Sequence, residues 1–173
     1  MSNQLPSLKN IKCHFKIENF NECILPKLSP QRHLGVYGNF FVLKNKYTYT
    51  VFLKNNFVNV TGISNFDELQ QVRKHLEKLL LPDVYLFSDI TVDNLTFSGL
   101  SSYVSKSLRE LQTSLRKKKA QVYFNSLRFP GLFVKFSCKG RIIVFSSGKY
   151  VIVGVKTIQE ANNIYNLFIQ HLS

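Results

Sequence analysis

The sequence has no tryptophan, one methionine and only three cysteines, Cys13, Cys23 and Cys138. An odd number of cysteines without Cys-x-x-Cys spacing argues against a disulfide framework and a zinc knuckle, so ordinary packing thiols are expected. No run approaches the ~18 consecutive apolar residues that a membrane span needs. The first ten residues also lack the apolar core of a secretory signal. These absences indicate an intracellular protein that does not enter a membrane.

Acidic residues are scarce, with 10 Asp and Glu against 23 Lys and Arg, which gives a formal net charge of +13. Such a surface attracts a polyanion, and nucleic acid is the leading partner. A basic pI that serves solubility alone is the plain alternative, whereas an anionic membrane is disfavoured because no long helix pairs a basic face with an exposed apolar one. The chain has 173 residues, 45% of them hydrophobic, and suits one compact domain or two half-size units that share a sheet.

Catalytic patterns are lacking as well. The histidines His14, His33, His75 and His171 are scattered, without a His-Glu-x-x-His pattern, and no nucleophile elbow is found. Residues 146–149 have neither the upstream glycine nor the following Ser or Thr of a P-loop. The sequence therefore predicts no enzymatic activity, no cofactor and no metal.

An internal repeat organises the chain. A β-branched residue, a glycine and a helix follow one another twice, around Gly62 and again around Gly154. Superposing the two glycines aligns two apolar helix faces position by position. The aligned faces are Phe66, Leu69, Val72, Leu76 and Leu80 in the first half and Ile158, Ala161, Ile164, Phe168 and Leu172 in the second.

Each of these helices has a start signal with capping-box spacing, Ser64 with Asp67 and Thr157 with Glu160. Each half also opens with a strand that contains an asparagine, followed by a further helix at about 19–28 or 101–118. The other predicted strands are 35–43, 47–52 and 57–61 in the first half and 132–137, 141–145 and 150–153 in the second.

The order strand, helix, strands, helix in each half predicts an α+β fold in which helices cover one face of an antiparallel sheet. Two such halves joined edge to edge would form one curved sheet with an uncovered second face. Alternation puts Ile143 and Phe145 on one face, and Lys149, Val151 and Val153 share a face across the next turn. Exposed apolar side chains of this kind mark an interaction site. Core packing is their commoner role, and alternation alone does not decide between the two.

Residues 128–156, RFPGLFVKFSCKGRIIVFSSGKYVIVGVK, resemble the second repeat of the TATA-box-binding protein family. The residues that stand at the family's motif positions are Phe129, Pro130, Gly131, Leu132, Phe145, Ser147, Gly148, Lys149, Gly154 and Lys156. Val155 stands where the family prefers alanine, and the hairpin is one residue shorter. The resemblance implies a saddle of tandem duplicated half-units, repeat 1–87 and repeat 88–173, which form one curved antiparallel sheet with helices on the convex face.

The resemblance also implies binding to duplex DNA through the minor groove. Phe129 and Phe145 would enter between base pairs and kink the duplex. Asn10 and Asn94, which match the family's paired asparagines, would donate to adenine N3 or thymine O2. The plain alternative is that each asparagine caps a turn.

The first repeat matches the family only in outline. The segment 29–32 resembles the family's Asn-Pro-Lys-Arg lead-in. The first wedge position then falls at His33 or Leu34, and the second at Phe52 or Leu53. A weaker kink, or one tuned to another base step, is expected from this half.

Further positions complete the predicted site. Lys12 and Thr96 stand where the family has small apolar residues beside the central bases, and Lys12 would add positive charge or reach a phosphate. Arg32, Lys44, Lys54 and Arg141 are additional candidates for phosphate contacts. The predicted DNA-binding residues are Asn10, Lys12, His33, Leu34, Phe52, Leu53, Phe57, Asn59, Thr61, Asn94, Thr96, Phe129, Lys135, Ile143, Phe145, Lys149, Val151, Val153 and Lys156.

The implied function is transcription initiation: binding and bending of A·T-rich promoter DNA and recruitment of initiation factors of the A or B type and RNA polymerase subunits. Self-association through the concave face is expected when DNA is absent. The implied location is the nucleus, or a cytoplasmic viral factory, since abundant Asn, Lys and Phe suggest an AT-rich genome of a viral or parasite lineage. Two alternatives stay open: a protein-interaction module of the same fold, and a single-strand or RNA binder that stacks bases on Phe129, Phe145 and Tyr49.

Overall fold

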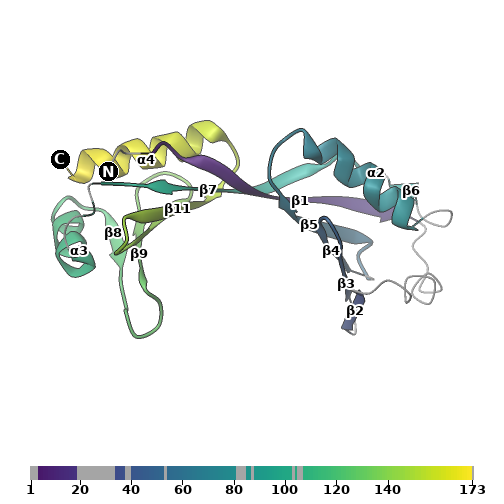
Figure 1. Ribbon diagram of the computed structural model, residues 1–173, viewed down its shortest axis with the longest axis horizontal. Helices are drawn as coiled ribbons and strands as arrows, with labels where there is room; N and C mark the ends of the chain where they lie inside the picture. The colour runs from purple at the N-terminus through teal and green to yellow at the C-terminus, as the bar shows by residue number, and fades with distance from the viewer. Residues whose placement is uncertain are drawn as a thin grey trace. The chain divides into compact units, whose positions relative to one another are not determined.

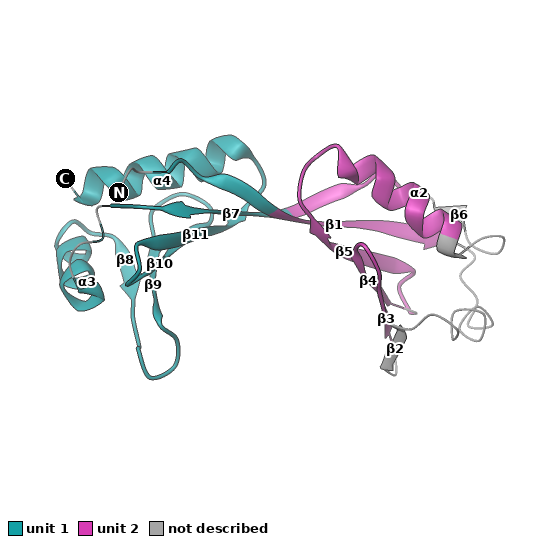
Figure 2. Ribbon diagram, in the orientation of Figure 1, with its two compact units in different colours: residues 1–9, 94–173 teal, residues 10–93 magenta. Residues whose placement is uncertain are grey.

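The computed structural model describes residues 4–18, 34–37, 40–52, 54–80, 85–86, 88–102, 104 and 107–172. The chain divides into two compact units: unit 1 comprises residues 1–9 and 94–173, and unit 2 comprises residues 10–93 (Figure 2). In each unit antiparallel strands lie side by side, and one long helix runs across one of their faces (Figure 1). No helix of the described residues is long and apolar enough to cross a membrane.

Unit 2 has the strand order β2-β3-β4-β5-β1, and the short strand β6 pairs with the end of β1. The strand β1 begins within the first residues of unit 1. The elements are β1 (Ser7–Glu18), β2 (Leu34–Tyr37), β3 (Phe40–Lys44), β4 (Thr48–Phe52), β5 (Phe57–Ile63), α2 (Glu68–Leu80) and β6 (Tyr85–Leu86).

Unit 1 has the strand order β7-β11-β10-β9-β8, and α4 packs on β11 and β10. The shorter helix α3 packs against β8 and α4. The elements are β7 (Thr91–Leu100), α3 (Leu108–Lys117), β8 (Gln121–Tyr123), β9 (Gly131–Lys135), β10 (Arg141–Phe145), β11 (Lys149–Val155) and α4 (Ile158–Leu172).

Each core consists of alternate strand residues and one helix face. In unit 1, Val134, Val144 and Ile152 are fully buried on three neighbouring strands, and Phe168 of α4 is fully buried as well. Unit 2 buries Val51, Val60, Val72 and Leu76 in the same way. The thiol of Cys13 lies in this core, where burial and the nearby charge of Asp93 raise its pKa to about 12. Cys13 is therefore the packing thiol that the sequence predicts.

The repeated glycines form the same β-bulge in both units. Gly62 has a φ of +89° and Gly154 a φ of +81°, a region that favours glycine. The register of β5 with β1 shifts there, between Cys13 opposite Val60 and Ile11 opposite Ile63. The register of β11 with β7 shifts at the same point, between Ile152 opposite Phe97 and Val155 opposite Leu95. The sequence repeat is thus a structural repeat, and it includes the β-bulge at the repeated glycine.

The start of α2 corrects the predicted capping box. The partner in the first turn is Glu68 and not Asp67, because the Glu68 carboxylate accepts the Ser64 backbone N–H at 2.8 Å. The side chain that caps the helix is that of Asn65, whose Oδ1 accepts the Glu68 N–H at 3.0 Å. In α4 the corresponding bonds run from the Glu160 N–H to Thr157 Oγ1 and from the Lys156 N–H to the Glu160 carboxylate.

Two other predicted elements have different bounds. The single strand expected at 35–43 is a pair of strands, β2 and β3, with Tyr37 opposite Phe40. The two residues between these strands in the sequence, Gly38 and Asn39, are of types that are common in turns. The helix expected at 101–118 begins only at Leu108, because Ser107 and Glu110 form a reciprocal capping box. The helix expected at 19–28 lies outside the described residues.

His75 is expected to make the stability of unit 2 depend on pH. Its Nδ1 lies 2.8 Å from the hydroxyl of the buried Tyr49. Burial, together with the positive charges of Lys46 and Lys78, lowers the pKa of His75. In the unfolded chain the histidine pKa is about 6.5, so at pH values near or below this the unfolded chain binds more protons than the folded one. The stabilisation is therefore complete above about pH 6.5 and is lost as the pH falls below that value.

We expect the melting temperature to fall between about pH 7.5 and pH 5, and His75→Gln to flatten this decline. The glutamine amide keeps an acceptor for the Tyr49 hydroxyl but does not titrate. Thermal melts of both proteins across the pH series test this. An equally steep decline in the variant would show that another group is responsible.

Candidate nucleic-acid interface

In unit 1 every second strand residue lies on the side opposite α4, and we call this side the open face of unit 1. Ile142 and Val144 of β10 are buried, whereas Ile143 and Phe145 between and beyond them are partly exposed. Ile143 is opposite Phe133 on one neighbouring strand and opposite Val151 on the other. The strand residues of this face are Thr96, Ser98, Phe133, Lys135, Arg141, Ile143, Phe145, Lys149, Val151 and Val153.

Three phenylalanine rings gather at one end of this face. The Phe129 ring centroid lies 5.1 Å from that of Phe133 and 5.9 Å from that of Phe145. Phe129 remains 37% exposed, so much of its ring is free to meet a partner. The ring lies directly over Gly131, because a Cβ at that position would stand 2.6 Å from Phe129 Cε1. The Phe-Pro-Gly sequence therefore places an aromatic ring on the sheet from the preceding loop.

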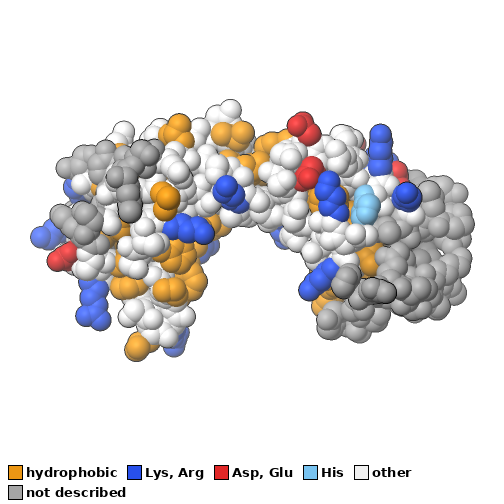
Figure 3. Space-filling view, in the orientation of Figure 1, with side chains coloured by type: hydrophobic (Ala, Val, Ile, Leu, Met, Phe, Trp, Pro, Cys, Tyr) orange, Lys and Arg blue, Asp and Glu red, His pale blue; other side chains and the backbone are white. Residues whose placement is uncertain are grey.

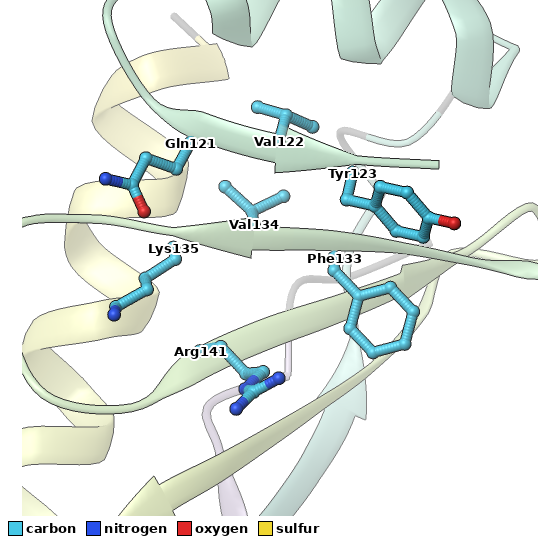
Figure 4. Close-up of a pocket in the computed structure, with 7 residues that line it drawn as sticks. All are labelled: Gln121, Val122, Tyr123, Phe133, Val134, Lys135 and Arg141. Atoms are coloured by element: carbon cyan, nitrogen blue, oxygen red, sulfur yellow. The ribbon is translucent and has the colours of Figure 1, made fainter. Parts of the chain in front are cut away.

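Cations flank these rings. Lys135 and Arg141 are exposed on β9 and β10, and with Tyr123 and Phe133 they line a shallow pocket of about 360 Å³ (Figure 4). In the space-filling view, hydrophobic side chains gather over this part of unit 1 with Lys and Arg side chains beside them (Figure 3). Aromatic faces next to positive charge suit a ligand that combines flat rings with phosphates.

The two asparagines have the same anchor. Asn10 Oδ1 accepts the backbone N–H of Gly62 at 2.8 Å, and Asn94 Oδ1 accepts that of Gly154 at 2.6 Å. The donor is in each case the glycine of the β-bulge. Because the oxygen of each amide is engaged by the protein, the group left to meet a partner is the Nδ2 amino group, a donor. Asn94 Nδ2 has one long contact, 3.5 Å to Thr96 Oγ1.

The open face of unit 2, defined in the same way as the side opposite α2, carries the predicted residues Lys12, Phe52, Phe57, Asn59 and Thr61. All are partly exposed and alternate with buried neighbours. A row of four rings, from Phe40 to His14, crosses this face. Successive centroids lie 5.7 Å apart for Phe40 and Phe52, 6.3 Å for Phe52 and Phe57, and 4.6 Å for Phe57 and His14.

Some predicted residues are placed elsewhere or are not described. His33 and Leu53 lie outside the described residues, and Leu34 stands in β2 opposite Leu43. Lys156 is exposed just beyond the bulge in β11. The proposal that Tyr49 stacks bases is wrong, because Tyr49 is fully buried and its hydroxyl bonds to His75.

Four residues of the open faces and their margins were not predicted to face a ligand: Phe40, Phe133, Tyr123 and His14. Phe40 could have been found from its buried neighbour Phe41, which fixes the opposite face for Phe40. His14 forms a 2.7 Å ion pair with Asp93, and spacing along the sequence gives no signal for that contact. Among the described residues no group of three His, Cys, Asp or Glu side chains could hold a metal ion.

Comparison with known proteins bears on both halves. Residues 89–173 match the family model described as transcription factor TFIID, or TATA-binding protein (TBP). The TBP of Methanococcus jannaschii superposes with a TM-score of 0.75 at 17% identity, covering 98% of this chain and 98% of that one. Clostridium acetobutylicum aspartate kinase gives a TM-score of 0.25 at 11% identity over 97% of this chain and 36% of that one, too low to indicate a shared fold. No curated protein matches the sequence.

The fold is therefore the α+β fold of TBP, built from duplicated half-units, as the sequence predicts. The whole chain has the TBP fold, and residues 89–173 carry the sequence signature of the TATA-binding protein family. The second half therefore matches a family of transcription factors and not of enzymes.

Proposed function

We propose that the protein is a transcription initiation factor that binds A·T-rich promoter duplexes through the minor groove and bends them. The observation that carries the proposal is the shared anchoring of Asn10 and Asn94. Each amide oxygen is taken by a bulge N–H, at 2.8 and 2.6 Å, so each side chain offers a donor. In the minor groove A·T pairs present only acceptors, adenine N3 and thymine O2, whereas a G·C pair adds the guanine N2 donor. Two fixed donors therefore favour A·T pairs.

Phe129 and Phe145 are proposed to supply the wedge. Their rings lie 5.9 Å apart at the end of the open face of unit 1, and Phe129 is 37% exposed. Inserting a flat ring replaces part of the base stacking that a kink removes, and the bent duplex gains contact with more of the protein. Ile143, Val151 and Val153 would cover the widened groove behind the wedge.

The charged residues are proposed to hold the phosphates. Lys135 and Lys149 are exposed at the margin of the open face of unit 1, and Lys12 is partly exposed in unit 2. The net charge of +13 supports the same ligand. In unit 2, the candidate contacts are Phe52, Phe57, Asn59 and Thr61, together with His33, Leu34 and Leu53 from the sequence analysis.

The wider role is proposed from the family. Bound promoter DNA would leave the helices available to initiation factors of the A or B type and to RNA polymerase subunits. The basic end of α3, at Arg116 and Lys117, is one such exposed surface. Without DNA, the apolar open faces would favour self-association. The site of action would be the nucleus, or a cytoplasmic viral factory if a cytoplasmic DNA virus encodes the protein.

Energy transfer between dyes at the two ends of a short duplex tests the proposal. We expect the protein to shorten the end-to-end distance of an A·T-rich duplex and to bind it more tightly than a G·C-rich duplex of equal length. Labelled single strands of the same sequence serve as the control. An unchanged end-to-end distance, or equal affinity for the single strands, would exclude promoter bending and favour a stacking or protein-binding role.

A further inference from the structure

The two units build their ring pairs from different positions. In unit 1 the last residue of β10, Phe145, stands opposite Gly131 of β9. In unit 2 the last residue of β4, Phe52, stands opposite Phe40 of β3. The register therefore makes Phe40 the counterpart of Gly131, and Phe52 the counterpart of Phe145.

The loops that precede these strands differ accordingly. Seven residues, 124–130, separate β8 from β9, but only residues 38 and 39 separate β2 from β3. The longer loop delivers the Phe129 ring onto Gly131. The shorter connection, Gly38 and Asn39, has no phenylalanine. The ring of unit 2 belongs instead to Phe40, the first residue of β3.

The two arrangements exclude one another at a single position. A Cβ on Gly131 would lie 2.6 Å from Phe129 Cε1 and 2.7 Å from Ile143 Cγ2, so a side chain there would displace the loop ring. Unit 2 has that side chain, in Phe40, and neither Gly38 nor Asn39 of its connection carries a ring. The outcome is nearly the same, since the ring centroids of Phe40 and Phe52 lie 5.7 Å apart and those of Phe129 and Phe145 lie 5.9 Å apart.

We infer that Phe40, paired with Phe52, is the aromatic contact through which unit 2 engages the duplex, in the place that Phe129 occupies in unit 1. The inference rests on the proposed function. It places the wedge of the first half at Phe40, whereas the sequence prediction placed it at His33 or Leu34. Both rings lie on the open face of unit 2, where alternate residues such as Phe41 and Val51 are buried. The row continues through Phe57 to His14, which supports the pair from the side.

The occupant is nucleic acid because of the charge around the row. Lys12 and Lys16 follow Asn10 along β1 on the same face, and Lys44 and Lys54 lie at the ends of neighbouring strands. A planar ring row bordered by lysines matches stacked bases bordered by phosphates. A protein partner would instead call for mixed polar groups at the rim.

The experiment uses the full chain and an A·T-rich duplex labelled at both ends. We expect Phe40→Ala and Phe129→Ala each to reduce bending and to weaken binding about tenfold, and the double variant to leave the duplex nearly straight. Phe66→Ala is the matched control, since Phe66 is 42% exposed and belongs to the turn before α2 and to no strand. This control should bend DNA like the wild type.

Phe40→Leu separates loss of the ring from loss of packing. Leucine keeps most of the apolar volume against Phe52 but has no flat face, so bending should still fall while the melting temperature stays near that of the wild type. Wild-type bending by both Phe40 variants, with bending reduced in Phe129→Ala, would overturn the inference and leave the proposed function standing. A wild-type protein that leaves the duplex straight would instead overturn the proposed function.

Discussion

Asn94→Asp is expected to weaken binding of A·T-rich DNA about 100-fold or more while leaving the fold intact. The carboxylate has nearly the same shape as the amide, and it still accepts the Gly154 N–H that Asn94 Oδ1 accepts at 2.6 Å. What changes is the second atom, which turns from a donor into a charged acceptor. It then faces acceptors on the base edges, so a hydrogen bond is lost and a like-charge repulsion is added.

Asn163→Asp is the matched control for this substitution. Asn163 is exposed on α4, so the same change lowers the net charge by one without altering the open face. Fluorescence anisotropy at fixed salt should show a small loss for the control and a large one for Asn94→Asp, with equal melting temperatures. Equal losses in the two variants would mean that Asn94 contributes only through charge, and the donor argument would be wrong. Asn10→Asp is expected to behave as Asn94→Asp does, because Gly62 anchors it identically.

The duplication was accessible to sequence analysis because the constraint is local. A positive φ requires glycine, and the helix that follows needs an apolar face, so the pair recurs visibly at Gly62 and Gly154. The open face of unit 1 was accessible for the same reason. Once Ile142 and Val144 are assigned to the core, period-two alternation fixes where Ile143 and Phe145 lie.

The anchoring of the asparagines was not accessible, because it depends on register. Asn10 and Gly62 are distant in sequence and meet only where β1 and β5 shift register. The opening strand of each half and the family resemblance identified Asn10 and Asn94 as equivalent. Neither indicated which amide atom would face outward.

The proposed role of Phe40 was not predicted, for another reason. The resemblance of 29–32 to the family's lead-in placed the wedge at His33 or Leu34. The interpretation of 35–43 as one strand also left the pairing of Tyr37 with Phe40 unforeseen. An alignment by motif looks for the wedge ring at the same sequence position as in the family. A ring can reach the same place in space from another residue, as proposed for Phe40, when the loop before the strand is shorter.

Phe145→Ala is expected to reduce bending far more than Lys135→Ala, although both residues lie on the open face of unit 1. Phe145 contacts Phe129 at 5.9 Å, and its removal takes away one ring of the proposed wedge and loosens the other. The kink depends on a flat surface that replaces base stacking, which alanine lacks. Lys135 is exposed at the margin of the face, so its removal should lower the slope of log affinity against log salt by about 0.9 and leave the bend nearly unchanged.

The contrast between the two variants carries more weight than either loss alone. A wedge changes the shape of the bound DNA at every salt concentration, whereas a phosphate contact changes how affinity responds to salt. Energy transfer on the saturated complex measures the first effect, and binding titrations over a salt series measure the second. If both variants altered only the salt slope, Phe145 would be a lining residue of the interface, and the bend would have to originate elsewhere on the protein.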